Sequence, residues 1–484
     1  MGRNSSLRAV KWVRHADSER PISRRIGTFF NETVPLALGF ETKSLREKLA
    51  SPLRRAMSEN VPIVAAGSAL EEAKQLLQAA AEIEHALLIQ YLYAAFSLRP
   101  SATRKTLINI AVQEMSHFLA VQNLLLFLGA DPYLERYDIS PNPELDPFPF
   151  GLKSLRTKET LEAFVLAEMP VIETLKEADR AVILEIKSRI DPQSKFHRVG
   201  VLYARIYWLF QETSKPEGDW TDVGNTGDIG PLPQWHINDF PGMPTFVTRQ
   251  ASRDEKGPRA DGQTGEIWWQ DYSREGAFSE VDSRATALHL IYSIAVQGEG
   301  LASGGANSHF WTFFRALKAY DELEPSDFYS VPENPITSAA GGQTEISHPV
   351  ARALCQFLND RYQIMLVSLA SALRRSRQDA SENDRRQALV SWAFYEMKYS
   401  IPKLTSEIVA QPCKNGGDAD ELCAGPTFEL GSVALSDDID ALEQENRALH
   451  VRARQSIDAL VALGFNADVI AKIAATDRDR YPDI

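Results

Sequence analysis

The longest apolar runs of the chain lie within residues 80–129, and their spacing follows the helical period. Ser68 begins a capping box directly before the first run, which predicts a helix that continues to about Leu98. Pro100 and Ser101 should make the turn to a second helix that runs to about Leu128, where Gly129 and Pro132 stop it. A connection this short makes the two helices antiparallel neighbours.

Helical periods recur along most of the remaining chain, whereas patterns typical of strands are scarce. Pro170 should end or kink the first of these later helices, and Ser279 and Ser308 are each expected to begin one. The expected helices cover residues 158–175, 197–212, 279–299, 308–323, 348–373, 388–410 and 437–465. The pattern therefore predicts an all-α fold.

Changes in this pattern divide the chain into three predicted parts. Residues 1–65 contain several prolines and no strong period, so we expect an N-terminal extension that docks onto the rest. Residues 66–330 should form a metal-binding helical bundle, and residues 331–484 a C-terminal helical unit that serves as scaffold or interface. Residues 213–280 are a long insertion rich in Gly, Pro and Trp, which we expect to act as a lid over a pocket.

Acidic and histidine residues interrupt both apolar runs. Glu114 and His117 form a Glu-x-x-His pair, and residues three apart project from one helical face, one turn apart. Glu84 lies in the preceding helix, and neither carboxylate has a Lys or Arg at helical spacing, so a metal ion is the expected partner. These residues supply half of the ligand set by which helical bundles bind two metal ions. Alternatively, Glu114 and His117 lie on a narrow solvated face with Gln113 and Ser116.

Three later residues complete the candidate ligand set. Glu168 lies on the apolar face of its helix and is the third carboxylate. Glu299 and His309 are the fourth carboxylate and the second histidine, but they stand ten residues apart across a glycine-rich break. By spacing alone they are weak candidates, because a histidine in the first turn of a helix is more often a neighbour of the cap. Tyr91 and Tyr207 are candidate proton or hydrogen-bond donors, although such tyrosines are more often core residues.

The composition narrows the function classes. The 484-residue chain is 44% hydrophobic, and its net charge of −13 without a Lys/Arg block disfavours nucleic acid or an anionic membrane as partner. No apolar stretch suits a signal peptide or a membrane span, so we expect a cytoplasmic protein. Cys355 should be a core residue, whereas Cys413 and Cys423 could form a disulfide or remain reduced, which is the cytosolic default. The oligomeric state, including a homo-oligomer, stays open.

Several motifs together resemble one known family. The segments are EIEHALLIQYLYAAFSL, INIAVQEMSHFLAVQNLLLFLGADP, FVLAEMP, VQGEGLASGGANSHF and AGPTFE, and QEMSHF with QGEG…SHF are the most specific of them. From Ser68 to Glu429 the chain looks like the ferritin-like proteins related to iminophenyl-pyruvate dimer synthase of the violacein pathway. This resemblance implies a ferritin-like bundle with long loop insertions and a carboxylate and histidine metal site. The ligands that it implies are Glu84, Glu114, His117, Glu168, Glu299 and His309.

Three functions fit these observations. The first is a non-haem di-metal enzyme, with iron or else manganese, that oxidises or couples a small aromatic substrate; relatives that join two imines made from aromatic amino acids suggest this chemistry. In this interpretation Glu114 or Glu299 bridges the ions. The second is metal binding or storage without substrate chemistry, and the third is a metal-free scaffold in which Arg or Lys reaches Glu84 and Glu114. A substrate-sized pocket beside the metal would favour the enzyme.

Overall fold

The computed structural model of the protein describes residues 10–14, 60–64, 66, 69–137, 145–210, 249–251, 256–258, 264–267, 279–299, 308–338, 344–431, 433, 435, 438–465 and 467–480. Helices dominate this part of the chain, so the all-α prediction is confirmed. The strands are short and form three two-stranded sheets: β1 (Val10–Arg14) with β2 (Asn60–Val64), β3 (Lys256–Pro258) with β4 (Thr264–Ile267), and β5 (Pro335–Ile336) with β6 (Thr344–Glu345).

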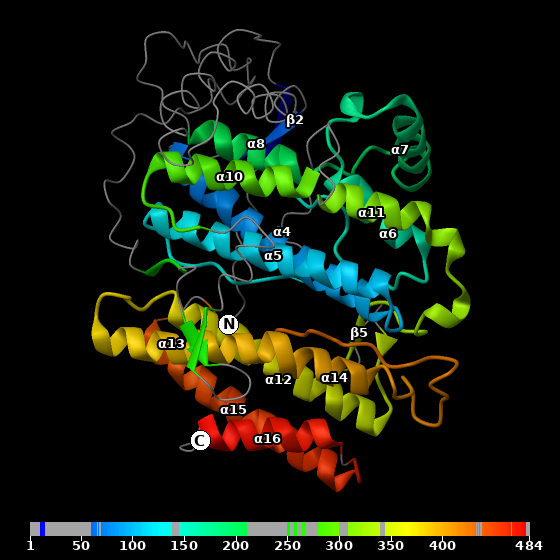
Figure 1. Cartoon of the computed structure of the whole chain (residues 1–484), viewed down its shortest axis with the longest axis vertical. Helices are drawn as coiled ribbons and strands as arrows, with labels where there is room; N and C mark the ends of the chain where they lie inside the picture. The colour runs from blue at the N-terminus through cyan, green and yellow to red at the C-terminus, as the bar shows by residue number, and fades with distance from the viewer. Residues whose placement is uncertain are drawn as a thin grey trace.

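Four helices surround the centre of the bundle (Figure 1). They are α4 (Ala69–Phe96), α5 (Ala102–Phe127), α8 (Val199–Leu209) and α10 (Arg284–Glu299), and each packs against the next around a closed ring. As predicted, α4 and α5 are neighbours along their length. The shorter helices α6 (Lys158–Glu168) and α11 (His309–Lys318) pack against each other, and α11 also packs against α5. The bundle thus has two long unbroken helices and, facing them, shorter helices that end within it.

Local sequence signals fix where these helices begin and end. The Ser101 side chain caps α5 by accepting from the Arg104 amide at 3.1 Å. Met169 precedes a proline, which disfavours helical geometry, so α6 ends at Glu168. The predicted cap at Ser308 is confirmed, because its side chain accepts from the Trp311 amide.

The predicted start of α10 at Ser279 was wrong. The helix begins at Arg284, and the hydroxyl of Ser283 accepts from the amide of Thr286, which is the contact of an N-cap. The Thr286 hydroxyl in turn donates to Asp282. Two serines and two acidic residues precede this helix within five positions, and the pattern alone does not tell which serine caps it.

A second group of helices lies along one side of the bundle (Figure 1). It comprises α12 (Pro349–Ala372), α13 (Ala380–Tyr395), the π-helix η8 (Glu396–Ser400), α14 (Ile401–Ile408), α15 (Ile439–Ala462) and α16 (Asp468–Arg480), whereas α7 (Glu177–Ile190) lies at the edge of the bundle. The described part of the chain also has three single helical turns: η1 (Ile172–Thr174), η6 (Tyr320–Glu322) and η7 (Pro325–Asp327). A buried Arg361 side chain joins α12 to η8 and α16 through Glu396 and Asp477.

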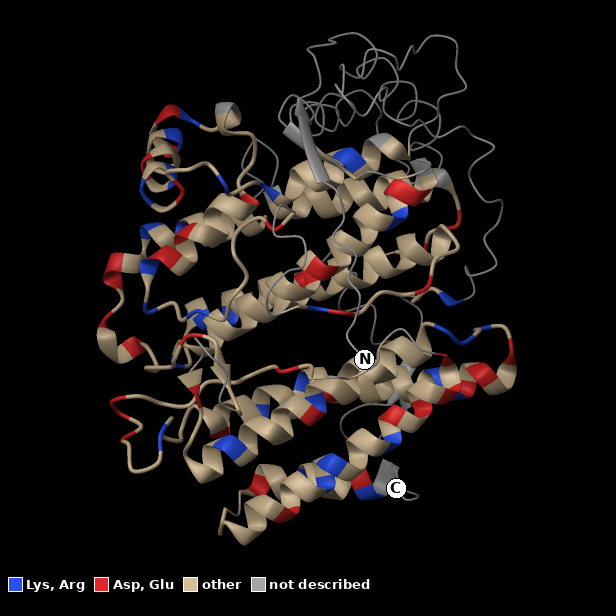
Figure 2. Ribbon diagram, turned by 180° about the vertical axis from the view of Figure 1, so that it is seen from behind, with Lys and Arg blue, Asp and Glu red and all other residues tan. Residues whose placement is uncertain are grey.

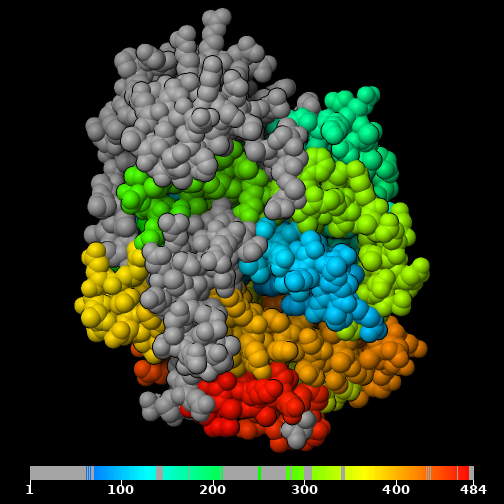
Figure 3. Space-filling model, in the orientation of Figure 1, coloured from blue at the N-terminus to red at the C-terminus, as the bar shows by residue number. Residues whose placement is uncertain are grey.

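The two groups of helices share a core. Their buried apolar side chains form one cluster that extends from α4 to α16. Between the groups, the Tyr362 hydroxyl on α12 lies 2.6 Å from Nε2 of His85 on α4. Charged residues are dense on α7, α15 and α16 and sparser on the helices of the bundle (Figure 2). On one face of the molecule, the blue surface around the α4–α5 turn lies between the green of α11 and the orange of the C-terminal helices (Figure 3).

Some predictions concern segments that the structure covers only in part. The Ser68 cap, most of the 1–65 extension and most of the 213–280 lid lie outside the described residues, although β2 packs against α4 and α8. The division at residue 331 stays a prediction. Cys413 and Cys423 are buried free thiols, so of the two alternatives the structure has the unpaired one. No described helix is long and apolar enough to cross a membrane.

Candidate metal centre

Glu114 lies between the two predicted histidine ligands. One of its carboxylate oxygens, Oε2, is 2.8 Å from Nδ1 of His117, and the other, Oε1, is 2.9 Å from Nδ1 of His309. All three side chains are at most 2% exposed, which excludes the alternative of a solvated polar face. The structure thus joins the Glu-x-x-His pair of α5 to the first residue of α11.

Two further carboxylates flank this group symmetrically. On the His117 side, Oε2 of Glu84 lies 3.6 Å from Nδ1 of His117. On the His309 side, Oε1 of Glu168 lies 3.8 Å from Nδ1 of His309. We call these five residues the Glu114 centre: each histidine has one flanking carboxylate, and Glu114 is shared.

A buried tyrosine donates a hydrogen bond to each flanking carboxylate. The Tyr91 hydroxyl donates to Oε1 of Glu168 at 2.7 Å, and the Tyr203 hydroxyl donates to Oε1 of Glu84. Burial, and then the charge of the neighbouring carboxylate, raises the pKa of both tyrosines well above 10. Both hydroxyls therefore keep their protons at neutral pH and act as donors.

Burial and mutual charge set the protonation of the centre. Burial, reinforced by the charge of Glu114, raises the pKa of Glu84 to about 7. Burial alone would also raise the pKa of Glu114, but the two histidines outweigh it and hold this pKa well below its usual range. For His309, burial is outweighed by Glu114 and Glu168, so its pKa rises to about 9; the pKa of His117 is raised for the same kind of reason.

The donor atoms of the centre fit a metal ion. Oε2 of Glu84, Oε1 of Glu114 and Nδ1 of His309 are buried and have no hydrogen-bond partner among the described residues, and the last two face each other without the alignment of a hydrogen bond. One donor atom from each of Glu114, His117 and His309 lies within 4.8 Å of the others. Carboxylate oxygens with imidazole nitrogens are ligands that iron and manganese accept.

The space beside these atoms is small. A cavity of about 10 Å³ adjoins the centre, which is room for about one water molecule. Residues of α8 and α10 form its wall opposite the carboxylates: Val199, Gly200, Tyr203, Ile294, Ala295 and Gly298. The described residues therefore leave space for an ion or a water-sized ligand at the centre, and not for an aromatic substrate.

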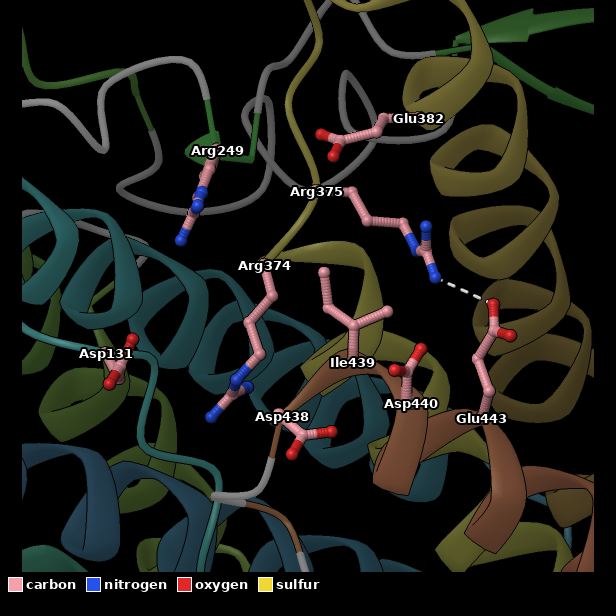
Figure 4. Close-up of a pocket in the computed structure, with 9 residues that line it drawn as sticks. All are labelled: Asp131, Arg249, Arg374, Arg375, Glu382, Asp438, Ile439, Asp440 and Glu443. Carbon is pink, nitrogen blue, oxygen red and sulfur yellow. Dashed lines mark hydrogen bonds and ion pairs between the residues drawn. The ribbon is translucent and has the colours of Figure 1, made fainter.

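A much larger pocket lies away from the centre, between the end of α12 and the start of α15 (Figure 4). Its volume is about 840 Å³ and its lining is almost entirely charged, with Arg375 paired to Glu443 at 2.7 Å. None of the lining residues belongs to the Glu114 centre. Asp438 and Asp440 at the start of α15 match the dipole of that helix, and Arg374 and Arg375 follow the end of α12, so helix ends and ion pairs account for this charge pattern without a ligand.

Gly298 allows Glu168 to take its position. A Cβ atom at this glycine would lie 2.8 Å from Oε2 of Glu168, closer than real Cβ contacts come. The glycine is next to last in α10, where the helix passes the end of α6. The backbone of α10 thus forms one wall of the centre.

Two predicted site residues remain, Glu299 and Tyr207. Glu299 ends α10, but its side chain lies outside the described part of the structure, so its role stays a prediction. Tyr207 lies one turn beyond Tyr203 on α8, near Tyr292 of α10. The hydrogen bond to Glu84 comes from Tyr203, which the sequence pattern had placed among core aromatics.

Sequence reasoning also missed the partners of the histidines. Nε2 of His117 lies 3.0 Å from Oε1 of Gln297, and Nε2 of His309 lies 2.9 Å from Oε1 of Gln113. The available signal was position alone: Gln113 directly precedes Glu114, and Gln297 precedes Gly298 at the end of its helix.

A family model agrees with this architecture, and two known proteins are similar to the chain. The model of the family described as ferritin-like matches residues 77–318, half of the chain, which includes every residue of the Glu114 centre. Dichlorochromopyrrolate synthase of Lentzea aerocolonigenes is 27% identical over 420 residues, covering 77% of this chain but only 37% of that protein. A solved ferritin-like protein from Caulobacter vibrioides is 19% identical with a TM-score of 0.31, over 60% of this chain and 82% of its own.

Proposed function

The chain belongs to the ferritin-like family, and from that premise we propose that it is a non-haem di-metal enzyme, with iron as the metal, that oxidises or couples a small aromatic substrate. The observation that carries the proposal is the symmetry of the Glu114 centre. One carboxylate lies between two histidines, and each histidine has its own flanking carboxylate. Helical bundles that bind two metal ions project carboxylates and histidines from facing helices into one centre, and these five residues are such a group.

In this proposal each residue of the centre has a definite role. Glu114 would serve both ions, Glu84 and His117 would hold one of them, and Glu168 and His309 would hold the other. Bound iron would supply the redox chemistry that activates dioxygen or peroxide. Without a bound ion the pKa of Glu84 is about 7, so this carboxyl group would give up its remaining proton when it binds a metal.

The hydrogen bonds and the apolar shell support this role. Tyr203 and Tyr91 orient the two flanking carboxylates through their hydroxyl groups. Buried apolar side chains from α4 and α5 keep bulk water away from the centre. Donors held in this way need little rearrangement when ions bind.

The substrate is proposed from the relatives. The similar protein from Lentzea aerocolonigenes is named for the synthesis of dichlorochromopyrrolate, and the motifs resemble enzymes that join imines of aromatic amino acids. We therefore propose an imine or enamine derived from an aromatic amino acid. Because the cavity holds about 10 Å³, such a substrate reaches the centre only if side chains of the α8 and α10 wall move.

Metal storage is the second candidate, and the small cavity favours it. A storage protein needs no substrate pocket, and the described residues show none beside the centre. The metal-free scaffold is less well supported. It predicts Arg or Lys at both central carboxylates, but the ion pairs found for Glu84 and Glu114 among the described residues are with histidines.

Metal content tests the proposal. The protein purified without added metal should contain about two irons per chain, and Glu114→Ala and His117→Ala should each lose them. His450→Ala, which removes a buried histidine of α15 far along the chain, controls for general loss of stability and should keep the iron. Many irons per chain would support storage, and a metal-free protein whose thermal stability does not change on adding iron would support the scaffold.

A further inference from the structure

Each histidine of the Glu114 centre has one ring nitrogen facing the carboxylates and the other facing a glutamine. For both histidines the inward atom is Nδ1, and Nε2 points outward. The outward atoms lie within hydrogen-bond distance of amide oxygens: 3.0 Å for His117 and Gln297, and 2.9 Å for His309 and Gln113. The same contact is therefore made twice, by residues from different helices.

In one contact α5 supplies the glutamine, and in the other it supplies the histidine. Gln113 on α5 reaches His309 at the start of α11, and Gln297 at the end of α10 reaches His117 on α5. Each glutamine thus holds a histidine that another helix supplies. Gln113 thereby fixes the rotation of the His309 ring at the start of α11, and Gln297 fixes the rotation of the His117 ring on α5.

An amide oxygen can only accept a hydrogen bond, so the ring nitrogen that faces it must carry the proton. A neutral imidazole with its proton on Nε2 has its lone pair on Nδ1. In both histidines Nδ1 is the atom beside Glu114 and a flanking carboxylate. The outward hydrogen bond therefore selects the ring form that can bind a metal ion at the centre.

We propose that Gln113 and Gln297 are positioning residues that hold His309 and His117 in the Nε2-protonated form, so that both histidines bind metal through Nδ1. This inference rests on the proposed metal centre. A neutral amide is suited to the place because the centre already contains three carboxylates. A carboxylate behind each histidine would perform the same orientation and add negative charge.

Zinc binding to the purified full chain tests this role without any assay of activity. Gln113→Leu and Gln297→Leu should each weaken zinc affinity by about 10- to 100-fold, because loss of such an outer partner usually has that effect. Gln113→Glu and Gln297→Glu keep an acceptor oxygen and should restore most of the affinity. Gln122→Leu is the matched control: Gln122 is also on α5, but it bonds to the backbone of Tyr133 and should not affect zinc.

Nitrogen-15 spectra of the zinc-loaded protein, labelled at histidine, give a second readout. Two histidines should show zinc on Nδ1 and a proton on Nε2. Three results would each overturn the role of the glutamines while leaving the metal centre intact. They are zinc bound to Nε2, zinc affinities of the leucine variants within twofold of the wild type, and glutamate variants that bind zinc as weakly as the leucine variants. A wild-type chain that binds no zinc and no iron would instead refute the proposed function, and this inference with it.

Discussion

Replacing Gly298 by alanine is a sharp test of the centre, because the change adds one atom at a defined place. The new Cβ would stand 2.8 Å from Oε2 of Glu168, whereas ordinary contacts of a Cβ begin at 3.4 Å. The carboxylate must therefore move by about 0.6 Å, the difference between these two distances. The atom that must move is the far end of a flexible side chain, so it can shift without unfolding the protein, although Tyr91 holds the other oxygen of the carboxylate.

A displacement of this size matters for a metal ligand. Metal–ligand distances tolerate only about 0.2 Å, so a shift of about 0.6 Å should remove Glu168 from the coordination of the ion beside His309. We expect a loss of at least about tenfold in the affinity for that ion, or about 1.4 kcal/mol. The free energy of unfolding of the metal-free protein should rise, because alanine is favoured over glycine in a helix by up to about 1 kcal/mol.

The assay is iron stoichiometry with thermal unfolding of the metal-free protein. Gly298→Ala should bind about one iron per chain instead of two and unfold at an unchanged or higher temperature. Ser293→Ala lies on the same helix outside the cavity lining and should keep two irons. Full iron stoichiometry in Gly298→Ala would show that Glu168 is not a ligand in this position, and loss of iron together with lower stability would show general unfolding instead.

Further predictions concern protonation and buried pairs. Tyr203→Phe leaves an oxygen of Glu84 without its donor, so the metal-free protein should lose about 1–3 kcal/mol in urea unfolding, and an unchanged midpoint would contradict this. The pKa of His309 is raised from 6.5 to about 9, so the folded state binds an extra proton and His309 should lower the stability of the metal-free protein by about 1.4 kcal/mol per pH unit from pH 6.5 to 9. His309→Gln should reduce the slope by this amount and leave the part due to His117, whose pKa is also raised. The pKa of Glu84 is raised from 4.5 to about 7, so Glu84 should also lower the stability as the pH rises from 4.5 to 7. Arg205→Met should cost about 3–5 kcal/mol in urea unfolding because Glu72 stays buried and charged, whereas adding Glu72→Leu should recover most of the loss.

The elements that the sequence predicts well are those whose signals lie within one helix. The long helices α4 and α5 follow from long apolar runs, and the turn between them lies at Pro100 and Ser101 as predicted. The Glu-x-x-His pair is also local: Glu114 and His117 meet because the helical repeat places them one turn apart. Neither needs knowledge of any other helix.

The remaining contacts depend on how α8 and α10 are rotated and shifted against α4 and α5. Tyr203 and Tyr207 are one turn apart on α8, and only the rotation of the helix decides which hydroxyl reaches Glu84. The place of Gln297 and Gly298 likewise depends on where α10 ends relative to α6. Periodicity identifies the buried face of a helix but not its height along the bundle, so these partners could not be named.

His309 shows most clearly why motif spacing is an incomplete guide. An unbroken helix could offer a second Glu-x-x-His pair, whereas here the chain leaves α10 and begins α11 with a serine cap followed at once by the histidine. The capped start of α11 brings Nδ1 of His309 to 2.9 Å from Glu114, which nearly equals the 2.8 Å of His117 on the regular helix. A metal ion constrains the positions of donor atoms and not the path of the chain between them. The break therefore preserves the symmetry of the centre while bringing Gln297 and Gly298, from the end of α10, into its wall.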